Sequence, residues 1–254
     1  MSEFLIFWIA SVFGAAAILP YQFGLMKEKI EEDRRNNPNK KIPPNSVLML
    51  INILQTSILL GVASYFGTKL APKVDLHWWL LDNWLNGNDV PYFIPLVISI
   101  AIVLGFAASL FIVLLDMYFS KKMPKVEVNF PSRKQSLLAS FYGGISEEVL
   151  TRLFVMTLIV YLASLLGLED AAYWIGIVFA AVLFGVLHLP AAIQLFGKSG
   201  IVIFRTILLN AVPGIIFGVL YWYYGIEIAM IAHFTGDIGL HVVFGPFFRN
   251  RANR

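Results

Sequence analysis

The sequence predicts an all-α fold, a polytopic transmembrane helical bundle of about seven to eight spans, and three observations predict it. The 254 residues are 58% hydrophobic and only 14% charged, whereas soluble domains are about 45–50% apolar. Several apolar runs exceed about 18 residues, the length at which a helix can cross the hydrocarbon core of a bilayer. Tryptophans lie near the ends of these runs, where interfacial aromatics belong: Trp78, Trp79, Trp174 and Trp222.

The apolar segments divide the chain into about seven spans, within a single membrane domain over residues 1–254. In order, the expected spans are residues 4–26, 46–71, 92–119, 136–168, 173–189, 201–224 and 226–248. Pro20 is expected to kink the first span and Pro190 to end the fifth. Asn210 and Pro213 interrupt the sixth. A broken helix near Pro213, or a crossing near Trp78, would add an eighth span.

The connections between spans set the expected orientation. Residues 27–45 and 121–134 are basic loops, and the chain ends in the basic segment 249–254. Residues 72–91 read as an interfacial loop with a short amphipathic helix. Because Lys and Arg concentrate on the cytoplasmic side, we expect the N-terminus outside and the C-terminus in the cytoplasm. The first apolar run lacks a preceding basic region, so we expect a retained span rather than a cleaved signal peptide.

Composition also excludes several classes of function. The chain contains no cysteine, which excludes disulfides, thiol catalysis and thiolate metal sites. Its net charge is only +3, and the positive residues lie in loops between spans, so the charge does not indicate a nucleic-acid-binding protein. The expected partners are the lipid bilayer and a substrate, and the expected location is a plasma membrane or an ER-type membrane.

The fourth span carries three ionisable residues, Glu147, Glu148 and Arg152, in an otherwise uncharged apolar run. Charged groups at this depth cost at least a few kcal/mol each, so they persist when they pair or perform chemistry. Glu148 and Arg152 are four residues apart and can form an ion pair on one helix face. Glu147 is rotated by about 100° from Glu148, which makes it the unpaired carboxylate and the functional candidate. The alternative is that all three form one structural ion network.

Two histidines are expected at the same depth as Glu147. His188 lies near the end of the fifth span and His233 lies within the seventh, with Asp237 four residues later on the same face. By the expected orientation, all of them fall between the mid-plane and the cytoplasmic face. A lone histidine in a span is often a packing residue, but independent packing residues need not agree in depth. The agreement predicts a shared polar cavity in the cytoplasmic half of the bundle.

These residues resemble the motifs of a known family. Glu147-Glu148-x-x-x-Arg152, Phe184-x-x-x-His188 and His233-x-x-x-Asp237 match, in order, the three motifs of the CPBP intramembrane proteases. That family includes the type II CAAX prenyl endopeptidase (Rce1-like) enzymes and the Abi proteins. The resemblance covers residues 136–246, a CPBP-like catalytic core. The chain departs from the family at Thr151, at Leu153 and at Asp237, where the family usually has Asn.

The resemblance implies an intramembrane endopeptidase that acts near the cytoplasmic surface without a cofactor. Glu147 would be the general base that activates water, and His188 would orient that water and pass a proton to the leaving amine. Phe184 would pack against the His188 ring. His233 and Asp237 would stabilise the oxyanion, which requires Asp237 to be protonated or to orient His233.

The same resemblance gives Glu148 and Arg152 a supporting role and leaves the substrate open. The two residues would hold the helix and bias Glu147. The substrate would be a peptide or a lipidated protein, such as a prenylated C-terminal CAAX tail.

Two alternatives remain open from the sequence. Glu147, His188 and His233 also fit a His₂Glu zinc site with an open position for water. Alternatively, the buried acids and histidines would serve a non-hydrolytic membrane protein, either a transporter or an idle immunity protein. The absence of an internal repeat argues against a transporter, because many transporters are built from inverted repeats.

Overall fold

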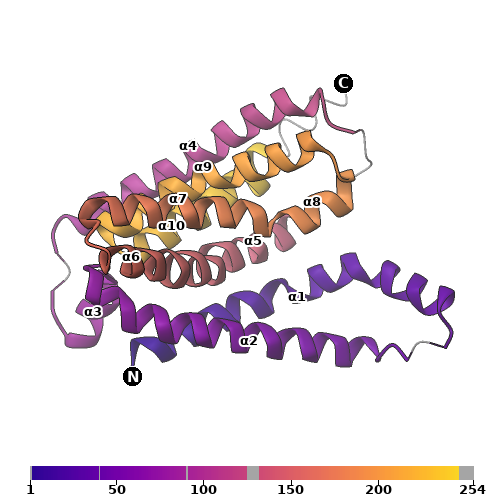
Figure 1. Cartoon of the computed structure of the whole chain (residues 1–254), viewed down its shortest axis with the longest axis horizontal. Helices are drawn as coiled ribbons and strands as arrows, with labels where there is room; N and C mark the ends of the chain where they lie inside the picture. Colours follow the sequence, from indigo (N-terminus) through magenta and orange to yellow (C-terminus); the bar gives the residue numbers. More distant parts are fainter. Residues whose placement is uncertain (1, 40, 90, 125–131, 246–254) are drawn as a thin grey trace.

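The computed structural model describes residues 2–39, 41–89, 91–124 and 132–245, and every regular element within them is helical (Figure 1). The predicted all-α polytopic bundle is confirmed. The predicted basic tail 249–254, Lys125 of the second basic loop and the expected end of the last span at residue 248 lie outside the described residues.

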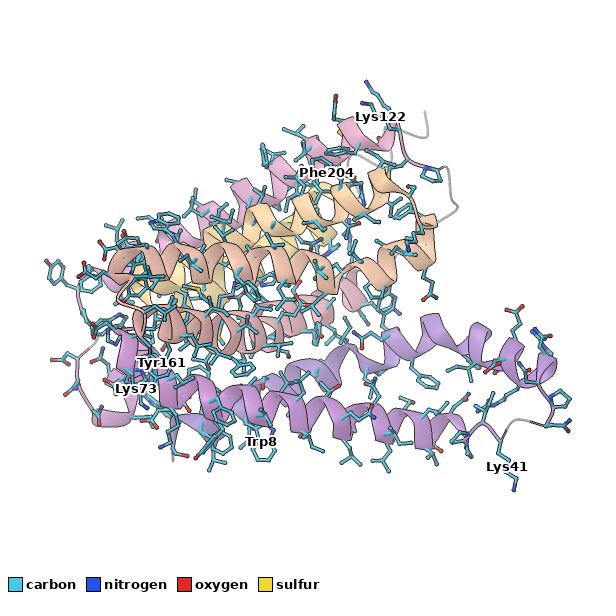
Figure 2. The ribbon with its side chains drawn as sticks, viewed as in Figure 1. Trp8, Lys41, Lys73, Lys122, Tyr161 and Phe204 are labelled. Carbon is cyan, nitrogen blue, oxygen red and sulfur yellow. The ribbon has the colours of Figure 1, made fainter. Side chains whose placement is uncertain are left out.

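The N-terminal part of the chain is a long helical hairpin. Its helices are α1 (Glu3–Asn36) and α2 (Asn45–Leu70), which lie side by side in Figure 1. The Trp8 indole of α1 donates a hydrogen bond to the Ser57 carbonyl of α2 at 2.9 Å. Pro20 lies inside α1 without ending it, and α1 continues through the first half of the predicted loop 27–45. Figure 2 labels Trp8 on this hairpin.

The connection that follows contains the predicted short amphipathic helix. It comprises the single turn η1 (Ala71–Val74) and α3 (Trp79–Asn86), before α4 (Ile94–Ser120) crosses the bundle. The carboxylate of Glu227 accepts a hydrogen bond from the Leu81 amide at 2.9 Å, which holds the start of α3 against the bundle. Lys73 lies over the ring of Tyr161, and both are labelled in Figure 2.

The central segment is a continuous helical path in four pieces over residues 133–164. They are α5 (Arg133–Phe141), η2 (Tyr142–Glu147), η3 (Val149–Met156) and α6 (Thr157–Ser164). Ser132 and Gln135 begin the path with a capping box. Both η2 and η3 are π-helical, a rare winding that often marks a functional site.

The C-terminal part adds the remaining helices of the bundle. They are α7 (Glu169–Leu187), α8 (Leu189–Phe196), α9 (Gly200–Tyr224), α10 (Ile226–Asp237) and the π-helical η4 (Ile238–Phe244). α7 ends at Leu187, close to the predicted end of the fifth span at residue 189, but α8 begins at Leu189 with Pro190 in its first turn, so the apolar segment continues to Phe196. The predicted interruption of the sixth span is wrong, because α9 continues through Asn210 and Pro213.

By length and composition, six of the described helical segments can cross a membrane. They are Glu3–Gly24, Asn45–Val74, Ile94–Ser120, Glu169–Phe196, Gly200–Tyr224 and Ile226–Phe244. The remaining predicted span corresponds to the continuous path 133–164, which carries Glu147, Glu148 and Arg152. Neither candidate for an eighth span adds a crossing, because α9 is unbroken and the 8 residues of α3 extend only about 12 Å.

The central path lies between the α1–α2 hairpin on one side and α7 and α10 on the other (Figure 1). Glycines allow this close packing, as is common between membrane helices. A Cβ on Gly67 of α2 would lie 2.6 Å from the Leu153 carbonyl oxygen, so no side chain fits there. Val149, Leu153 and Met156 are fully buried. Glu148 and Arg152 on this path are likewise completely buried.

Candidate active site

Glu148 and Arg152 form the predicted ion pair at the centre of the bundle. Glu148 Oε1 lies 2.9 Å from Arg152 Nη1, and both side chains are completely buried. Arg152 also donates to Thr151 Oγ1 at 2.6 Å and to the Gly214 carbonyl at 3.1 Å. Its guanidinium lies over the ring of Phe184, 5.0 Å from the centroid. These contacts offset much of the cost of burying the cation, although Arg152 Nε and Glu148 Oε2 are buried without a hydrogen-bond partner among the described residues.

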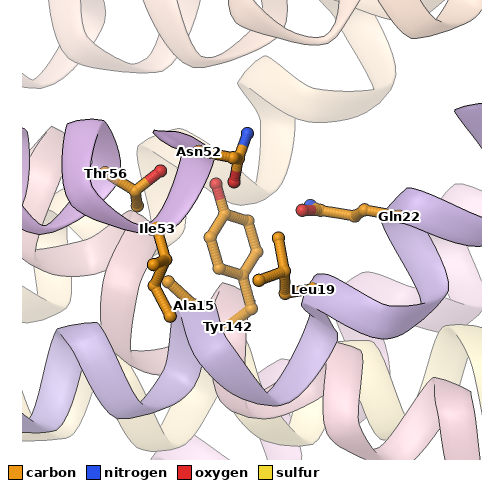
Figure 3. Close-up of a pocket in the computed structure, with 7 residues that line it drawn as sticks. All are labelled: Ala15, Leu19, Gln22, Asn52, Ile53, Thr56 and Tyr142. Atoms are coloured by element: carbon orange, nitrogen blue, oxygen red, sulfur yellow. The ribbon is translucent and has the colours of Figure 1, made fainter. Parts of the chain in front are cut away.

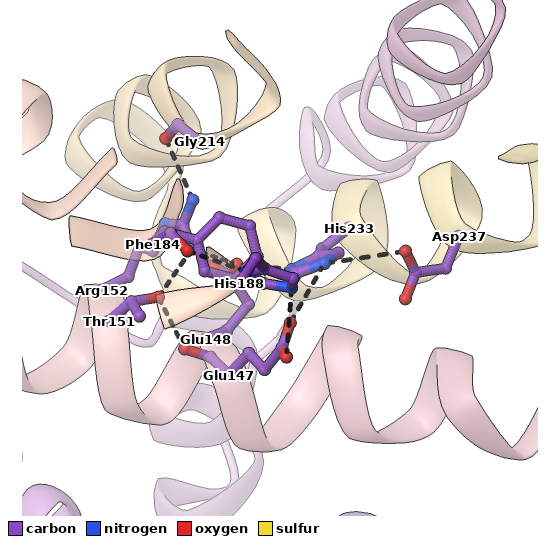
Figure 4. Close-up of polar contacts among 9 residues, drawn as sticks. All are labelled: Glu147, Glu148, Thr151, Arg152, Phe184, His188, Gly214, His233 and Asp237. Carbon is purple, nitrogen blue, oxygen red and sulfur yellow. Dashed lines mark hydrogen bonds and ion pairs between the residues drawn. The ribbon is translucent and has the colours of Figure 1, made fainter. Parts of the chain in front are cut away.

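His233 is held by the same buried carboxylate. Its Nδ1 lies 2.7 Å from Glu148 Oε1, and since a carboxylate only accepts hydrogen bonds, Nδ1 donates. The ring stacks on Phe217 with centroids 4.7 Å apart and meets Phe184 edge-on. A carboxylate on Nδ1 fixes the orientation of an imidazole and directs its Nε2 the other way. Here Nε2 points toward Glu147 (Figure 4).

Glu147 lies between the two histidines (Figure 4). Its Oε1 is 4.0 Å from His188 Nε2, and its Oε2 is 3.8 Å from His233 Nε2. These gaps are too long for direct hydrogen bonds and match the spacing that one water molecule bridges. The Glu147 side chain is 18% exposed, whereas that of Glu148 is fully buried. The two neighbouring carboxylates thus have different environments.

His188 reaches Glu147 from the bend between α7 and α8. Its Nδ1 donates to the Phe184 carbonyl at 2.8 Å, which leaves Nε2 facing the carboxylate. The Phe184 ring packs against the His188 ring with centroids 4.6 Å apart. The His188 side chain is 36% exposed, so the cluster opens to the surroundings at this residue.

Asp237 lies beside His233 but is not hydrogen-bonded to it. Its Oδ1 is 3.8 Å from His233 Nε2. Of the two roles expected for Asp237, direct orientation of His233 has no hydrogen bond to support it, and Glu148 makes that contact instead. Gly143 lies directly against this pair, because a Cβ there would collide with Asp237 Oδ2 and lie 3.2 Å from His233 Nε2.

The three predicted motifs therefore contribute their polar residues to one cluster. Residues 131–239 match the family described as type II CAAX prenyl endopeptidase Rce1-like. These 109 of the 254 residues are therefore similar to an Rce1-like domain. This domain indicates an integral membrane protease of the CAAX type, as the motifs predicted. No curated protein and no solved structure is significantly similar to the chain.

The three candidate zinc ligands include two pairs that lie somewhat farther apart than the ligands of a bound zinc ion. Ligands of a tetrahedral zinc lie about 3.4 Å apart when each bond is about 2.1 Å. Glu147 is 4.0 Å from His188 and 3.8 Å from His233. In the part of the chain that the structure describes, no group of three or more His, Cys, Asp or Glu side chains is arranged to hold a metal ion.

Some contacts of the cluster were not predicted from the sequence. Thr151 was noted only as a departure from the family, yet its hydroxyl donates to the Glu147 carbonyl at 2.6 Å and accepts from Arg152. The bond to the Glu147 carbonyl was predictable, because a threonine hydroxyl in a helix often donates to the carbonyl four residues earlier. Asn210, which was expected to interrupt the sixth span, donates to the Thr206 carbonyl of its own helix at 2.8 Å.

Proposed function

We propose that the protein is a metal-free, glutamate-type intramembrane endopeptidase that cleaves a peptide bond near the cytoplasmic membrane surface. The observation that carries this proposal is the position of Glu147, one water away from both His188 and His233. A carboxylate and an imidazole on either side of one water are the groups that general acid–base hydrolysis requires.

Glu147 acts as the general base in this proposal. It takes a proton from the bridging water while the water oxygen bonds to the scissile carbonyl carbon. His188 accepts a hydrogen bond from the same water at Nε2, since its Nδ1–H is engaged by the Phe184 carbonyl. The water is thereby oriented before it attacks, which lowers the entropy cost of reaching the transition state.

The tetrahedral intermediate carries an oxyanion that His233 stabilises. Protonated His233 donates to the oxyanion from Nε2, while Glu148 balances the charge at Nδ1. Asp237, 3.8 Å from Nε2, acts in its protonated form, so that it donates rather than repels. The intermediate collapses when the carbon–nitrogen bond breaks and the proton taken by Glu147 passes, through His188, to the leaving amine. The products are a carboxylic acid and an amine.

The proposed substrate is a prenylated protein with a C-terminal CAAX tail, presented from the cytoplasm. Two observations support this class. The family match is to CAAX prenyl endopeptidases, and the cluster opens at His188, at the end of α7 rather than in its middle. With the basic loops in the cytoplasm, this opening faces the side on which prenylated proteins are made. The protein would reside in a plasma membrane or an ER-type membrane.

The test compares two quenched peptides of the same CAAX sequence, one farnesylated and one not, in proteoliposomes containing the purified protein. Each is assayed with and without a strong zinc chelator. Cleavage of the farnesylated peptide alone, unaffected by the chelator, is the expected result. Cleavage that the chelator abolishes would assign the reaction to a metal enzyme. Equal cleavage of both peptides would remove the prenyl requirement.

A further inference from the structure

A second polar site lies on the hairpin side of the central path. It is a pocket of about 160 Å³ between α1, α2 and Tyr142 (Figure 3). Four of its seven lining residues are polar and uncharged: Gln22, Asn52, Thr56 and Tyr142. Figure 3 shows the Tyr142 ring standing between the two helices, with its hydroxyl on the side where Asn52 lies. Such a lining is unusual among helices that are otherwise apolar.

The polar groups of this pocket have spare hydrogen-bonding capacity. None of the four side chains makes a hydrogen bond to another residue in the described ranges of the chain. Together they offer two amide groups and two hydroxyls, each able to donate and to accept. Asn52 is exposed and the other three side chains are partly buried, and a bound water needs two to four polar partners of this kind. A volume of about 160 Å³ is enough for several water molecules.

The pocket borders the catalytic carboxylate. Tyr142 and Glu147 are the first and last residues of the π-helical turn η2. A π-helix joins residues five apart by a backbone hydrogen bond, so these two side chains lie on adjacent turns of nearly the same face. Gly143, the next residue, contacts His233 and Asp237. Tyr142 thus separates the pocket from the cluster.

The wall of the pocket is held firmly against this turn. Ser146 donates from its hydroxyl to the Ser11 carbonyl of α1 at 2.6 Å. One turn along α1, a Cβ on Gly14 would lie 2.7 Å from Ser146 Oγ and 2.9 Å from the Phe141 carbonyl oxygen. This contact fixes α1 beside Tyr142.

We propose that this pocket is a water-binding site that supplies the hydrolytic water to Glu147. The inference rests on the proposed function. A peptide bound at the catalytic cluster must cover the opening at which His188 is 36% and Glu147 18% exposed. Water can then no longer arrive from that side. Water bound in the pocket, on the other side of Tyr142, can pass the Tyr142 hydroxyl and reach Glu147 without passing through the bound peptide.

The first experiment tests whether the pocket is wet, and it does not depend on activity. The chain has no cysteine, so single-cysteine variants report one position each. Thr56→Cys places a thiol in the pocket, whereas Ile58→Cys, two residues along the same helix, replaces a side chain that is 66% exposed on the apolar surface. Thiols react as thiolates, which form in water.

In proteoliposomes, Thr56→Cys should react with a charged methanethiosulfonate reagent at least tenfold faster than Ile58→Cys. Equal, slow rates would show a dry pocket and overturn the proposal.

The second experiment asks whether the water serves the reaction. Asn52→Leu combined with Tyr142→Phe removes two polar groups of the pocket. We expect kcat for the farnesylated peptide to fall about tenfold, with KM within twofold of the wild type. Gln55→Leu removes an exposed amide of α2 outside the pocket and serves as the control. It should leave both constants unchanged.

Two results of the second experiment would overturn the proposal. A raised KM with unchanged kcat would make the pocket a peptide subsite, and unchanged constants would make its water irrelevant to the reaction. Wild-type protein that cleaves no peptide would instead contradict the proposed function. In that case the cysteine rates still decide whether the pocket binds water.

Discussion

Replacing Arg152 by methionine should destabilise the protein strongly, because it leaves the Glu148 carboxylate without its cation. Both side chains are completely buried, and their charged atoms are 2.9 Å apart. Removing one partner of a buried ion pair costs about 3–5 kcal/mol. The carbonyl of Gly214 and the hydroxyl of Thr151 also lose a donor, at about 1 kcal/mol each. For a chain of this size, each kcal/mol lowers Tm by about 2–4 °C, so the expected loss is roughly 10 °C or more.

The assay is a thermal unfolding scan in detergent, followed by the fluorescence of the six tryptophans. The double variant Glu148→Gln/Arg152→Met replaces the unpaired Glu148 carboxylate by a neutral amide, so its Tm should be higher than that of Arg152→Met. Arg205→Met is the matched control. Arg205 also donates to an aspartate, Asp116 Oδ1, at 2.6 Å, but that carboxylate is 40% exposed. Its loss should cost no more than about 1 kcal/mol. A Tm change below about 2 °C for Arg152→Met, or a double variant that melts lower than the single one, would refute this reasoning.

Three further predictions concern the cluster. Gly143→Ala should reduce peptide cleavage by at least about tenfold, because its methyl group collides with the Asp237 carboxylate; Gly24→Ala, where a Cβ meets nothing within 4 Å, should retain full activity, and equal activity of the two would contradict the close contact. Thr151→Val should lower Tm by a few degrees, at about 1 kcal/mol for each lost hydrogen bond, and Thr151→Ser should restore most of it; two variants of equal Tm would show that the hydroxyl contributes nothing. Dialysis against a zinc chelator should leave the rate of peptide cleavage unchanged, and a loss that added zinc reverses would establish a metal centre.

The local part of the site was predictable because helix geometry fixes which near neighbours share a face. The ion pair of Glu148 with Arg152 follows from a separation of four residues. The end of α7 at Leu187 follows from Pro190, which lacks a backbone N–H and whose ring clashes with the carbonyl four residues earlier. The bundle itself follows from the length of the apolar runs.

The contacts between distant segments could not be predicted in this way. Glu148 and His233 are 85 residues apart, and their contact depends on how α10 packs against the central path. The π-helical winding of η2 and η3 was also not predicted from the sequence. The unbroken α9 shows the same limit, because a proline in the middle of a membrane helix is tolerated when neighbouring groups satisfy the freed backbone.

The measurement that tests the central claim most directly is the cleavage rate of the Glu147→Gln variant. Glutamine keeps the size and the hydrogen-bonding oxygen of the side chain but cannot take a proton. Loss of a general base lowers kcat by about 10²–10⁴-fold, and we predict a fall of this size in proteoliposomes with the farnesylated peptide, with KM within a fewfold of the wild type. A Glu147→Gln variant that cleaves the peptide at the wild-type rate would contradict the account.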